Sequence, residues 1–299
     1  MALPPAPLTL LAIYAHPDDE SFGPGGTLAR YAAEGVDVHV VIVTDGAAGS
    51  ADEKYLKSHS SLAERREELG AAVDALGATL HQLSYRDSGM EGSPDNGNPD
   101  ALYQAPLDEV ACELVAWIRR LRPQVILTHE PSGIYYHPDH IKVHHAVNQA
   151  WAWSGDAVAC PEGRLPPWQP QRLFWDVLSD RWVGRFVRLL RLFGQDPTRF
   201  GRNKDIDLTR FGTPDDEITT RVDVRDTLAA KRRASAAHAS QGGGDPLLRW
   251  MPLFLLRRLV GVETFLQAQP RAPIQPDDLF AGLRDQPVPA PARKENNPS

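Results

Sequence analysis

A histidine and three acidic residues follow directly on an apolar run near the start of the chain, in "LLAIYAHPDDESFGPGGTL". His16 and Asp19 are three positions apart and offer an imidazole nitrogen and a carboxylate oxygen, a pair of ligands that zinc accepts. A chain that turns after a strand can aim both side chains at one point. The segment therefore suggests half of a metal site.

A second cluster supplies more imidazoles. His137, His140 and His144 share one helical face, because Pro138 begins the helix and positions three and four apart are neighbours. One of them would complete a site with two histidines, one carboxylate and an open position for water. Catalytic zinc takes this form, whereas structural zinc is usually closed by four protein ligands.

The remaining polar residues fit a metal-assisted amide hydrolysis. Asp18, beside Asp19, can take the proton of a water whose pKa a zinc ion lowers to about 7. His137 can protonate a leaving amine, and Tyr135 or Tyr136 can donate a hydrogen bond to a tetrahedral oxyanion.

Each residue alone has a simpler explanation, since a single aspartate is more often a helix cap and a single histidine a hydrogen-bonded core residue. Two clusters at the same edge of a sheet favour a site. The glycines of "GPGG" at 23–26 suggest a dinucleotide loop, but the G-x-G-x-x-G spacing is absent and three acids would lie at the pyrophosphate. We reject that interpretation.

The elements that position these residues alternate between apolar strands and amphipathic helices. This order, with short connections, predicts a Rossmann-like three-layer αβα fold with a mainly parallel sheet, which binds ligands at the carboxyl ends of its strands. We expect strands over 8–15, 36–44, 79–85, 124–130 and 172–179, and helices over 25–35, 60–77, 107–123, 138–153 and 227–241.

We expect one domain over residues 1–285. Its first half, 1–155, would be the Rossmann-like part with the metal site, and 156–285 an additional α/β portion on the substrate side. The tail 286–299 is expected to be disordered. The segment 247–262, broken by three arginines and a proline, is an amphipathic docking or membrane-surface helix or, the interpretation we prefer, a helix packed on its own domain.

Composition narrows the classes of protein. Hydrophobic residues make up 42% of the 299, enough for a core, and 32 basic against 39 acidic residues give a net charge of -7. Mild acidity argues against nucleic acid as a partner and leaves small polar substrates open. The spacing of Cys112 and Cys160 suggests buried free thiols in a reducing cytosol. No signal peptide or transmembrane segment is evident, so we expect a cytoplasmic protein, and homo-oligomerisation is left open.

Two motifs together resemble a known family. "AHPDDE" at 15–20 and "HPDH" at 137–140 are similar to the signatures of the LmbE/PIG-L zinc de-N-acetylases, which remove acetyl groups from N-acetylglucosamine conjugates or cleave related amides. The similarity covers roughly residues 8–241. "RDSGM" at 86–90 resembles the branch that acts on mycothiol, bacillithiol and similar thiol precursors.

The resemblance implies a role for each matching residue. The ligands of Zn²⁺, with Fe²⁺ or another divalent metal as an alternative, would be His16, Asp19 and His140. Asp18 would be the general base and His137 the general acid or electrostatic stabiliser.

Further roles also rest on the resemblance. Tyr135 takes the place of a mobile active-site tyrosine, and Arg65 and Asp87 match positions that hold the sugar. Asp139 would orient a histidine, whereas His238 is at least as well explained as a structural helix residue.

The sequence departs from the family pattern in the loop "HEPSGIYY", where Glu130 replaces a common aspartate and Ile134, Tyr135 and Tyr136 are bulky. The implied function is a metal-dependent de-N-acetylase of an N-acetylglucosamine-type conjugate. Two alternatives are an amidase of thiol S-conjugates with the same machinery and a non-catalytic sugar-binding relative.

Overall fold

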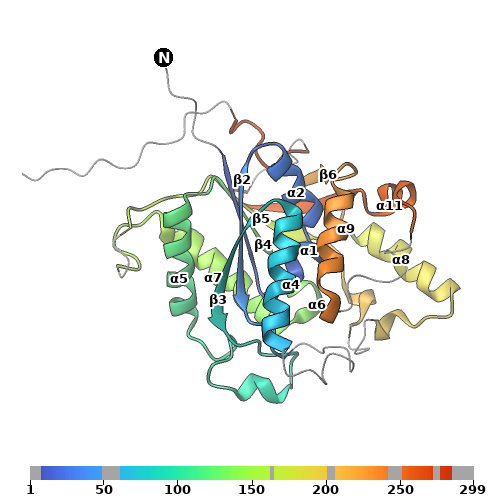
Figure 1. Cartoon of the computed structure of the whole chain (residues 1–299), viewed down its shortest axis with the longest axis horizontal. Coiled ribbons are helices and arrows are strands. Elements are labelled where there is room, and N and C mark those ends of the chain that lie inside the picture. The colour runs from blue at the N-terminus through green and yellow to red at the C-terminus, as the bar shows by residue number, and fades with distance from the viewer. Residues whose placement is uncertain are drawn as a thin grey trace, which may run out of the picture.

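A seven-stranded sheet forms the centre of the molecule, in a computed structural model that describes residues 8–48, 61–161, 165–200, 206–241, 251–271 and 277–284 (Figure 1). The order across the sheet is β3-β2-β1-β4-β5-β7-β6. Strands β1 to β5 pair in parallel, and β7 is antiparallel to both β5 and β6. The bounds are β1 Thr9–Tyr14, β2 Asp37–Thr44, β3 Thr79–Tyr85, β4 Val125–His129, β5 Arg172–Val177, β6 Thr220–Asp223 and β7 Val262–Gln269.

The central strands are continuous apolar runs because helices cover both of their faces. Every residue of β1 is buried, and so are those of β4. The five predicted strands are therefore present, each within a residue or two of its expected range.

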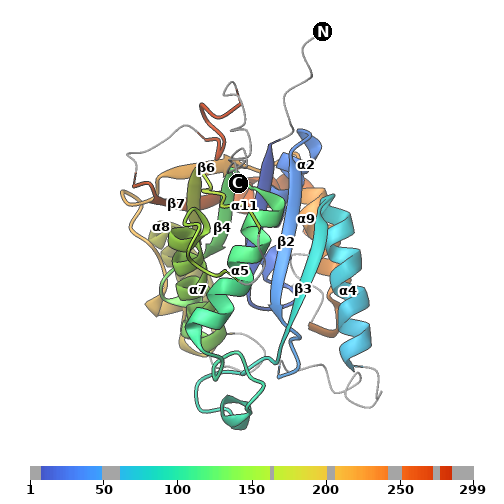
Figure 2. The same cartoon turned by 90° about the vertical axis from the view of Figure 1, so that its left-hand side faces the viewer.

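Helices on the two sides of the sheet make three layers, as Figure 2 shows. One side packs α2 (Gly25–Ala33), α4 (Ser61–Leu76), α9 (Leu228–Ala237) and α11 (Leu253–Val260) against the sheet. The other side packs α5 (Leu107–Leu121) and α7 (Pro138–Ser154). The predicted αβα architecture is confirmed.

The part of the chain after residue 155 extends the same sheet with β5, β6 and β7. It also adds α8 (Asp180–Leu192), whose buried Val183 and Val187 form a small cluster with Leu208. Of the segment 247–262, the structure describes 251–262, and the expected tail 286–299 lies outside the described residues. Among the described helices, none has the length and apolar composition that crossing a bilayer requires.

The prediction of free thiols is wrong. Cys112 in α5 and Cys160 after α7 form a disulfide with their Cα atoms 5.3 Å apart. A separation of 48 residues gives no pairing signal, and what brings the two together is tertiary packing. Arg119 donates hydrogen bonds to five carbonyls between residues 153 and 160, which holds that loop against α5.

Candidate metal and catalytic site

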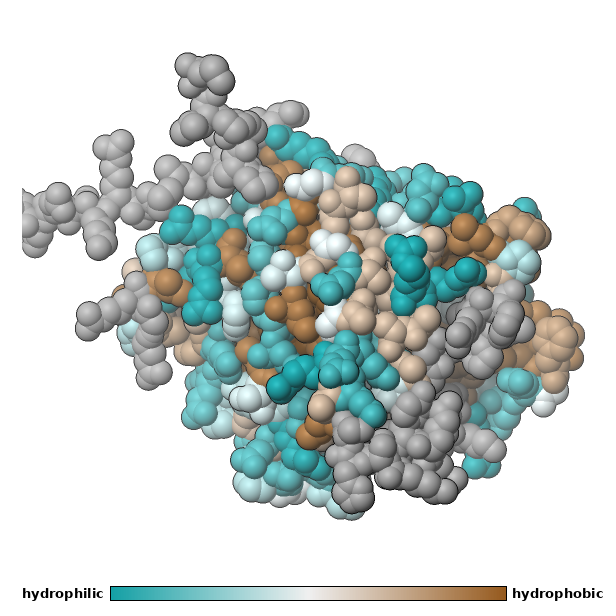
Figure 3. Space-filling view, in the orientation of Figure 1, coloured by the Kyte–Doolittle hydropathy of each residue, from teal (hydrophilic) through white to brown (hydrophobic). Residues whose placement is uncertain are grey.

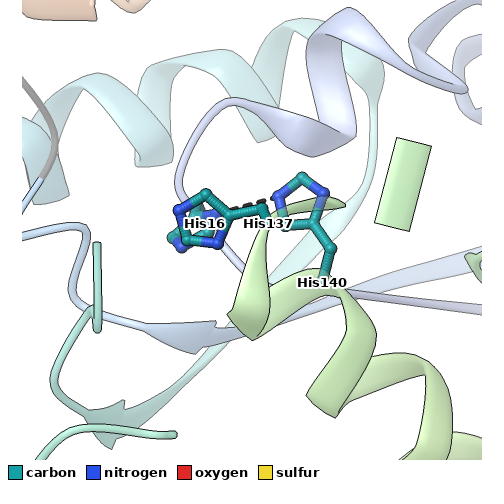
Figure 4. A group of neighbouring side chains, drawn as sticks. All are labelled: His16, His137 and His140. Atoms are coloured by element: carbon teal, nitrogen blue, oxygen red, sulfur yellow. Dashed lines mark hydrogen bonds between the residues drawn. The ribbon is translucent and has the colours of Figure 1, made fainter. Parts of the chain in front are cut away.

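The two predicted clusters meet at the carboxyl ends of β1 and β4. His16 follows β1, Asp19 begins the short helix α1 (Asp19–Phe22), and His140 lies in the first turn of α7. His16 Nδ1 is 3.0 Å from His140 Nε2 and 3.6 Å from Asp19 Oδ2, while His140 Nε2 is 3.3 Å from Asp19 Oδ1. Figure 4 shows the imidazoles of His16 and His140 facing each other, with His137 beside them.

These distances fit a metal ion. Zinc binds nitrogen and oxygen at about 2.0–2.1 Å, so two ligand atoms of a tetrahedral site lie roughly 3.3 Å apart. The three separations between His16, Asp19 and His140 lie on either side of that value. Nitrogen and carboxylate donors also accept several other divalent ions. The donor set and its spacing therefore suit a divalent cation.

Asp18 lies next to this cluster on a strained backbone. Its φ of 132° falls in a region that favours glycine, as is common where a side chain must be aimed at a functional site. Partial burial and the adjacent Asp19 carboxylate raise the pKa of Asp18 to about 8, against the opposing effect of His238 and His16.

His137 is the N-cap of α7. Its Nδ1 accepts a hydrogen bond from the backbone N–H of Asp139 at 3.2 Å. Burial, with the neighbouring His16 and His140, lowers the pKa of His137 to about 2. A neutral imidazole that accepts at Nδ1 carries its proton on Nε2. His137 can therefore donate a hydrogen bond from Nε2.

Two buried carboxylates lie on the far side of the His16 ring. His16 Nε2 is 3.2 Å from Asp139 Oδ2 and 3.4 Å from Asp87 Oδ1. Asp139 Oδ2 also accepts the backbone N–H of Ser88. A carboxylate behind an imidazole fixes the orientation of the ring, which agrees with the orienting role expected for Asp139.

The two residues expected to hold the sugar are both nearly buried. Asp87 is 3% exposed and accepts backbone N–H groups from Ala48 and Gly89. Burial opposes its ionisation, but His16 and the N–H of Gly89 hold the pKa of Asp87 below its ordinary value. Arg65, 5% exposed, lies so close to Gly46 that a Cβ there would be 2.7 Å from Arg65 Nη1.

Tyr135 lies in α6 (Gly133–Tyr136), the turn before α7, with its hydroxyl 3.5 Å from His140 Nε2. Its neighbours Ile134 and Tyr136 both have a φ of 64°. The Glu130 carboxylate accepts hydrogen bonds from the backbone N–H of Ser132 and of Ile134 and from the Ser132 hydroxyl. The glutamate that departs from the family pattern therefore holds this turn in place.

His129, the last residue of β4, also lies at the site and was not predicted from the sequence. Its ring stacks on that of His140 with centroids 3.9 Å apart, and its Nε2 is 3.5 Å from Asp19 Oδ2. The same nitrogen accepts the N–H of Ala15 at 3.1 Å. Its position at the carboxyl end of a central strand could have indicated a site residue. It was not predicted because no second metal-binding residue lies three or four positions away in the sequence.

Glu20 and His238 form a buried pair beneath the site, with His238 Nε2 2.7 Å from Glu20 Oε1. Glu20 also accepts the backbone N–H of Asp18, so the pair supports the strained residue. His144 and His145 point elsewhere: His144 Nδ1 contacts the carbonyl of His129 and His145 is exposed.

The glycines of the "GPGG" segment do not leave a free helix end. The N–H groups of Gly26 and Thr27, at the start of α2, both bind the Glu263 carboxylate from β7. A Cβ on Gly26 would be 2.7 Å from Val224, so the glycine lets α2 pack closely. The groups that would bind a pyrophosphate are already occupied.

Known proteins are similar to this chain in sequence and in fold. The family described as "PIG-L: GlcNAc-PI de-N-acetylase" matches residues 11–151. The chain is 39% identical to 1D-myo-inositol 2-acetamido-2-deoxy-alpha-D-glucopyranoside deacetylase of Thermobispora bispora, over 86% of each chain. It is 37% identical to the protein of the same name from Acidothermus cellulolyticus, over 92% of this chain and 95% of that one.

The similarity extends to an experimental structure, N,N'-diacetylchitobiose deacetylase from Pyrococcus horikoshii. The TM-score is 0.59 at 23% identity, over 87% of this chain and 83% of the other. At that identity, the likeness establishes a common fold.

Proposed function

Because the chain belongs to the PIG-L family of de-N-acetylases, we propose that it is a metal-dependent hydrolase that removes the N-acetyl group from an N-acetylglucosamine-type conjugate. One observation carries the proposal: His16, Asp19 and His140 converge within 3.0–3.6 Å beside the Asp18 carboxylate and the His137 imidazole. This is the donor set, base and hydrogen-bond donor that amide hydrolysis needs.

In this proposal His16, Asp19 and His140 hold the metal, zinc in the first instance and Fe²⁺ or another divalent ion as alternatives. The cation, when bound, supplies Lewis acidity, lowers the pKa of water and favours the ionised form of Asp18. Asp139 and Asp87 keep the His16 ring turned toward its position through contacts of 3.2 and 3.4 Å.

Asp18 acts as the general base and takes a proton from the attacking water. His137 donates from Nε2 to the oxygen or nitrogen of the reacting amide, since its Nδ1 is already an acceptor. Its lowered pKa favours the neutral imidazole, so we assign His137 a stabilising hydrogen bond. The proton that Asp18 takes from the water then passes to the leaving amine, and the acetyl group is released as acetate. We propose that Tyr135, whose hydroxyl is 3.5 Å from His140 Nε2, donates a hydrogen bond to the oxyanion of the tetrahedral intermediate.

For the substrate, we propose an inositol-linked N-acetylglucosamine, the compound that the names of the relatives from Thermobispora and Acidothermus specify. Arg65 and Asp87 are proposed to contact its sugar. Both are nearly buried without substrate, so this contact requires the neighbouring loops to admit the sugar.

A substrate panel tests the reaction and the substrate together. Inositol-linked N-acetylglucosamine, N,N'-diacetylchitobiose and an acetylated cysteine S-conjugate would each be incubated with the protein, and free amine and acetate measured. We expect the highest kcat/KM with the inositol conjugate. Faster cleavage of the S-conjugate would favour an amidase, and no acetate from any substrate would contradict the proposal.

A matched pair of histidine variants on α7 tests the metal site. His140→Ala removes a proposed ligand, whereas His145→Ala changes an exposed histidine on the same helix. We expect the wild type and His145→Ala to retain one divalent ion per chain by elemental mass spectrometry, and His140→Ala to lose it. Equal metal content in the two variants would contradict the assignment.

A further inference from the structure

One end of the molecule exposes apolar side chains from two neighbouring helices. We name it the α8–α11 face; in Figure 3 it corresponds to the brown surface toward the right-hand end. Leu192, Phe193 and Phe254 are 82%, 76% and 75% exposed. The exposed apolar residues of the face are Trp182, Leu189, Leu192, Phe193, Phe254, Leu255 and Leu259.

The two helices are in contact. The indole N–H of Trp182 in α8 donates a hydrogen bond to the carbonyl of Leu259 in α11 at 3.1 Å. On their inner sides, Val187 of α8 packs on the small cluster around Leu208, and Leu256 of α11 packs on the main core. Their inner faces are thus already used, and the exposed residues form a second, outer face.

Arginines accompany the exposed apolar side chains. Together α8 and α11 contain six arginines and one aspartate, in a chain whose net charge is -7. Four of the six are exposed and form no ion pair with another described residue: Arg185, Arg188, Arg191 and Arg258. The face is therefore basic as well as apolar, opposite in sign to the whole chain.

We propose that the α8–α11 face binds the surface of an anionic lipid membrane. Helices that lie in a membrane interface insert aromatic and leucine side chains and place arginines at the headgroups, which is the composition of this face. A symmetric contact with a second copy would instead bring the same arginines against one another. An uncharged apolar partner would leave them without counter-charges.

The face adjoins the edge of the sheet that carries the metal site. Helix α8 begins three residues after β5 ends at Val177. Arg210, which follows the Leu208 that packs on α8, lies over the Tyr136 ring at 4.7 Å from its centroid. Membrane binding would thus bring the turn that contains Tyr135 and Tyr136 toward the lipid surface.

Co-sedimentation with vesicles tests the proposal on the full chain. Vesicles of phosphatidylcholine alone and of phosphatidylcholine with a quarter phosphatidylglycerol would be compared at low and at high salt. We expect the protein to pellet with the anionic vesicles, to remain largely in the supernatant with the neutral ones, and to be released by salt.

Two double variants separate the contributions that the arginines and the apolar side chains of the face make to vesicle binding. Arg185→Gln with Arg188→Gln should weaken the partition coefficient about fivefold for each arginine. Leu192→Ser with Phe193→Ser should weaken it by at least tenfold. Neither pair lies in the catalytic machinery, so deacetylation of a dissolved substrate should not change.

A control pair comes from the opposite side of the molecule. Val158→Ser and Arg120→Gln change an exposed valine and an exposed arginine near α5, which Figure 1 shows away from α8. They should pellet like the wild type. No binding of the wild type to anionic vesicles would overturn the proposal, and so would an equal loss in the control. Dimers that Leu192→Ser with Phe193→Ser dissociates, without vesicle binding, would identify a second copy as the occupant instead.

Discussion

The carboxyl edge of the sheet buries polar side chains, whereas the α8–α11 face exposes apolar ones. At the sheet edge, charged and polar side chains such as His16, Glu20 and Asp139 are buried against each other. At the α8–α11 face, large apolar side chains such as Phe193 are in water. Both arrangements cost free energy of folding, because folded proteins usually bury the apolar groups and expose the charged ones.

The difference lies in what offsets that cost. At the sheet edge the offset is internal, since most of the buried groups contact one another and the proposed metal completes the set. At the α8–α11 face the described residues do not cover the apolar side chains, and we expect the proposed lipid surface to supply the offset. Substitutions at the edge should therefore affect turnover or folding, and those on the face should affect neither.

The largest effect at the sheet edge is expected for Asp18→Asn. The amide keeps the shape of the side chain but cannot take a proton, so kcat should fall by about 10²–10⁴-fold with metal content unchanged. Steady-state kinetics and elemental analysis check this. Asp74→Asn on the exposed side of α4 is the control. Near-wild-type turnover of Asp18→Asn would mean that another group is the base.

Removal of His238 should have the largest effect on stability. His238→Leu leaves the buried Glu20 carboxylate with only the N–H of Asp18 and the hydroxyl of Ser21 as donors among the described residues, which we expect to lower the free energy of unfolding by about 3–5 kcal/mol. Burial opposes the charged form, but the hydrogen bond to Glu20 raises the pKa of His238. A raised histidine pKa stabilises the fold fully below the unfolded value of about 6.5, and this contribution is lost as pH rises through the folded pKa.

Denaturant titrations of wild type and His238→Leu at several pH values measure this difference. It should be greatest below pH 6.5 and decrease above it. A difference that grows with pH would contradict the assigned sign.

A smaller effect is expected on substitution of His129, which contacts two of the proposed metal ligands, Asp19 and His140. His129→Leu leaves the Ala15 N–H without an acceptor and removes the ring stacked on His140, so metal affinity should weaken about 10–100-fold. His129→Gln, whose amide oxygen can replace Nε2, should recover most of it. Competition with a chelator measures both. Equal losses in the two variants would indicate a packing role alone.

The smallest effect should be that of Asp176→Asn, at the end of β5. Burial, with the charges of Asp19 and Glu263, raises the pKa of Asp176 well above its ordinary value, so the fold favours the protonated carboxyl. Below about pH 4, where the carboxyl is protonated in the folded and the unfolded chain alike, its replacement by an amide should change stability by about 1 kcal/mol or less.

The pH dependence has a defined sign. The folded chain keeps a proton on Asp176 that the unfolded chain releases above about pH 3.9, so this residue lowers stability as pH rises. Asp176→Asn should therefore become more stable relative to wild type as pH rises above about 4. Thermal unfolding checks this, and the opposite trend would show that Asp176 is ionised in the fold.

The sequence predicted the parts of the site that lie close together along the chain. The strand before His16 and the helix that begins at Pro138 follow from hydrophobic periodicity and proline position, and parallel topology brings their ends to one edge. Contacts between residues far apart in the chain could not be predicted, because they produce no local pattern in the sequence. Glu20 and His238 are 218 positions apart, and Cys112 and Cys160 are joined only because α5 and the loop after α7 are neighbours.

The segment 247–262 shows why a local pattern was insufficient. Its amphipathic helix was expected to pack on its own domain, and Leu256 does so at 4% exposure. Phe254 and Leu259 are exposed instead, because an eight-residue helix has room for only one inner face. Which residues face outward depends on where α8 lies, and the sequence of the segment does not contain that information.

The bond between Glu263 and the start of α2 has a consequence for the independence of the two halves. All three proposed metal ligands lie in 1–155, yet α2, the helix that follows His16 and Asp19, is capped by a carboxylate near the other end of the chain. A fragment that stops at residue 155 would lose this cap together with His238. It would contain every metal donor and still lack the interactions that hold them in place, so the proposed metal site depends on the intact chain.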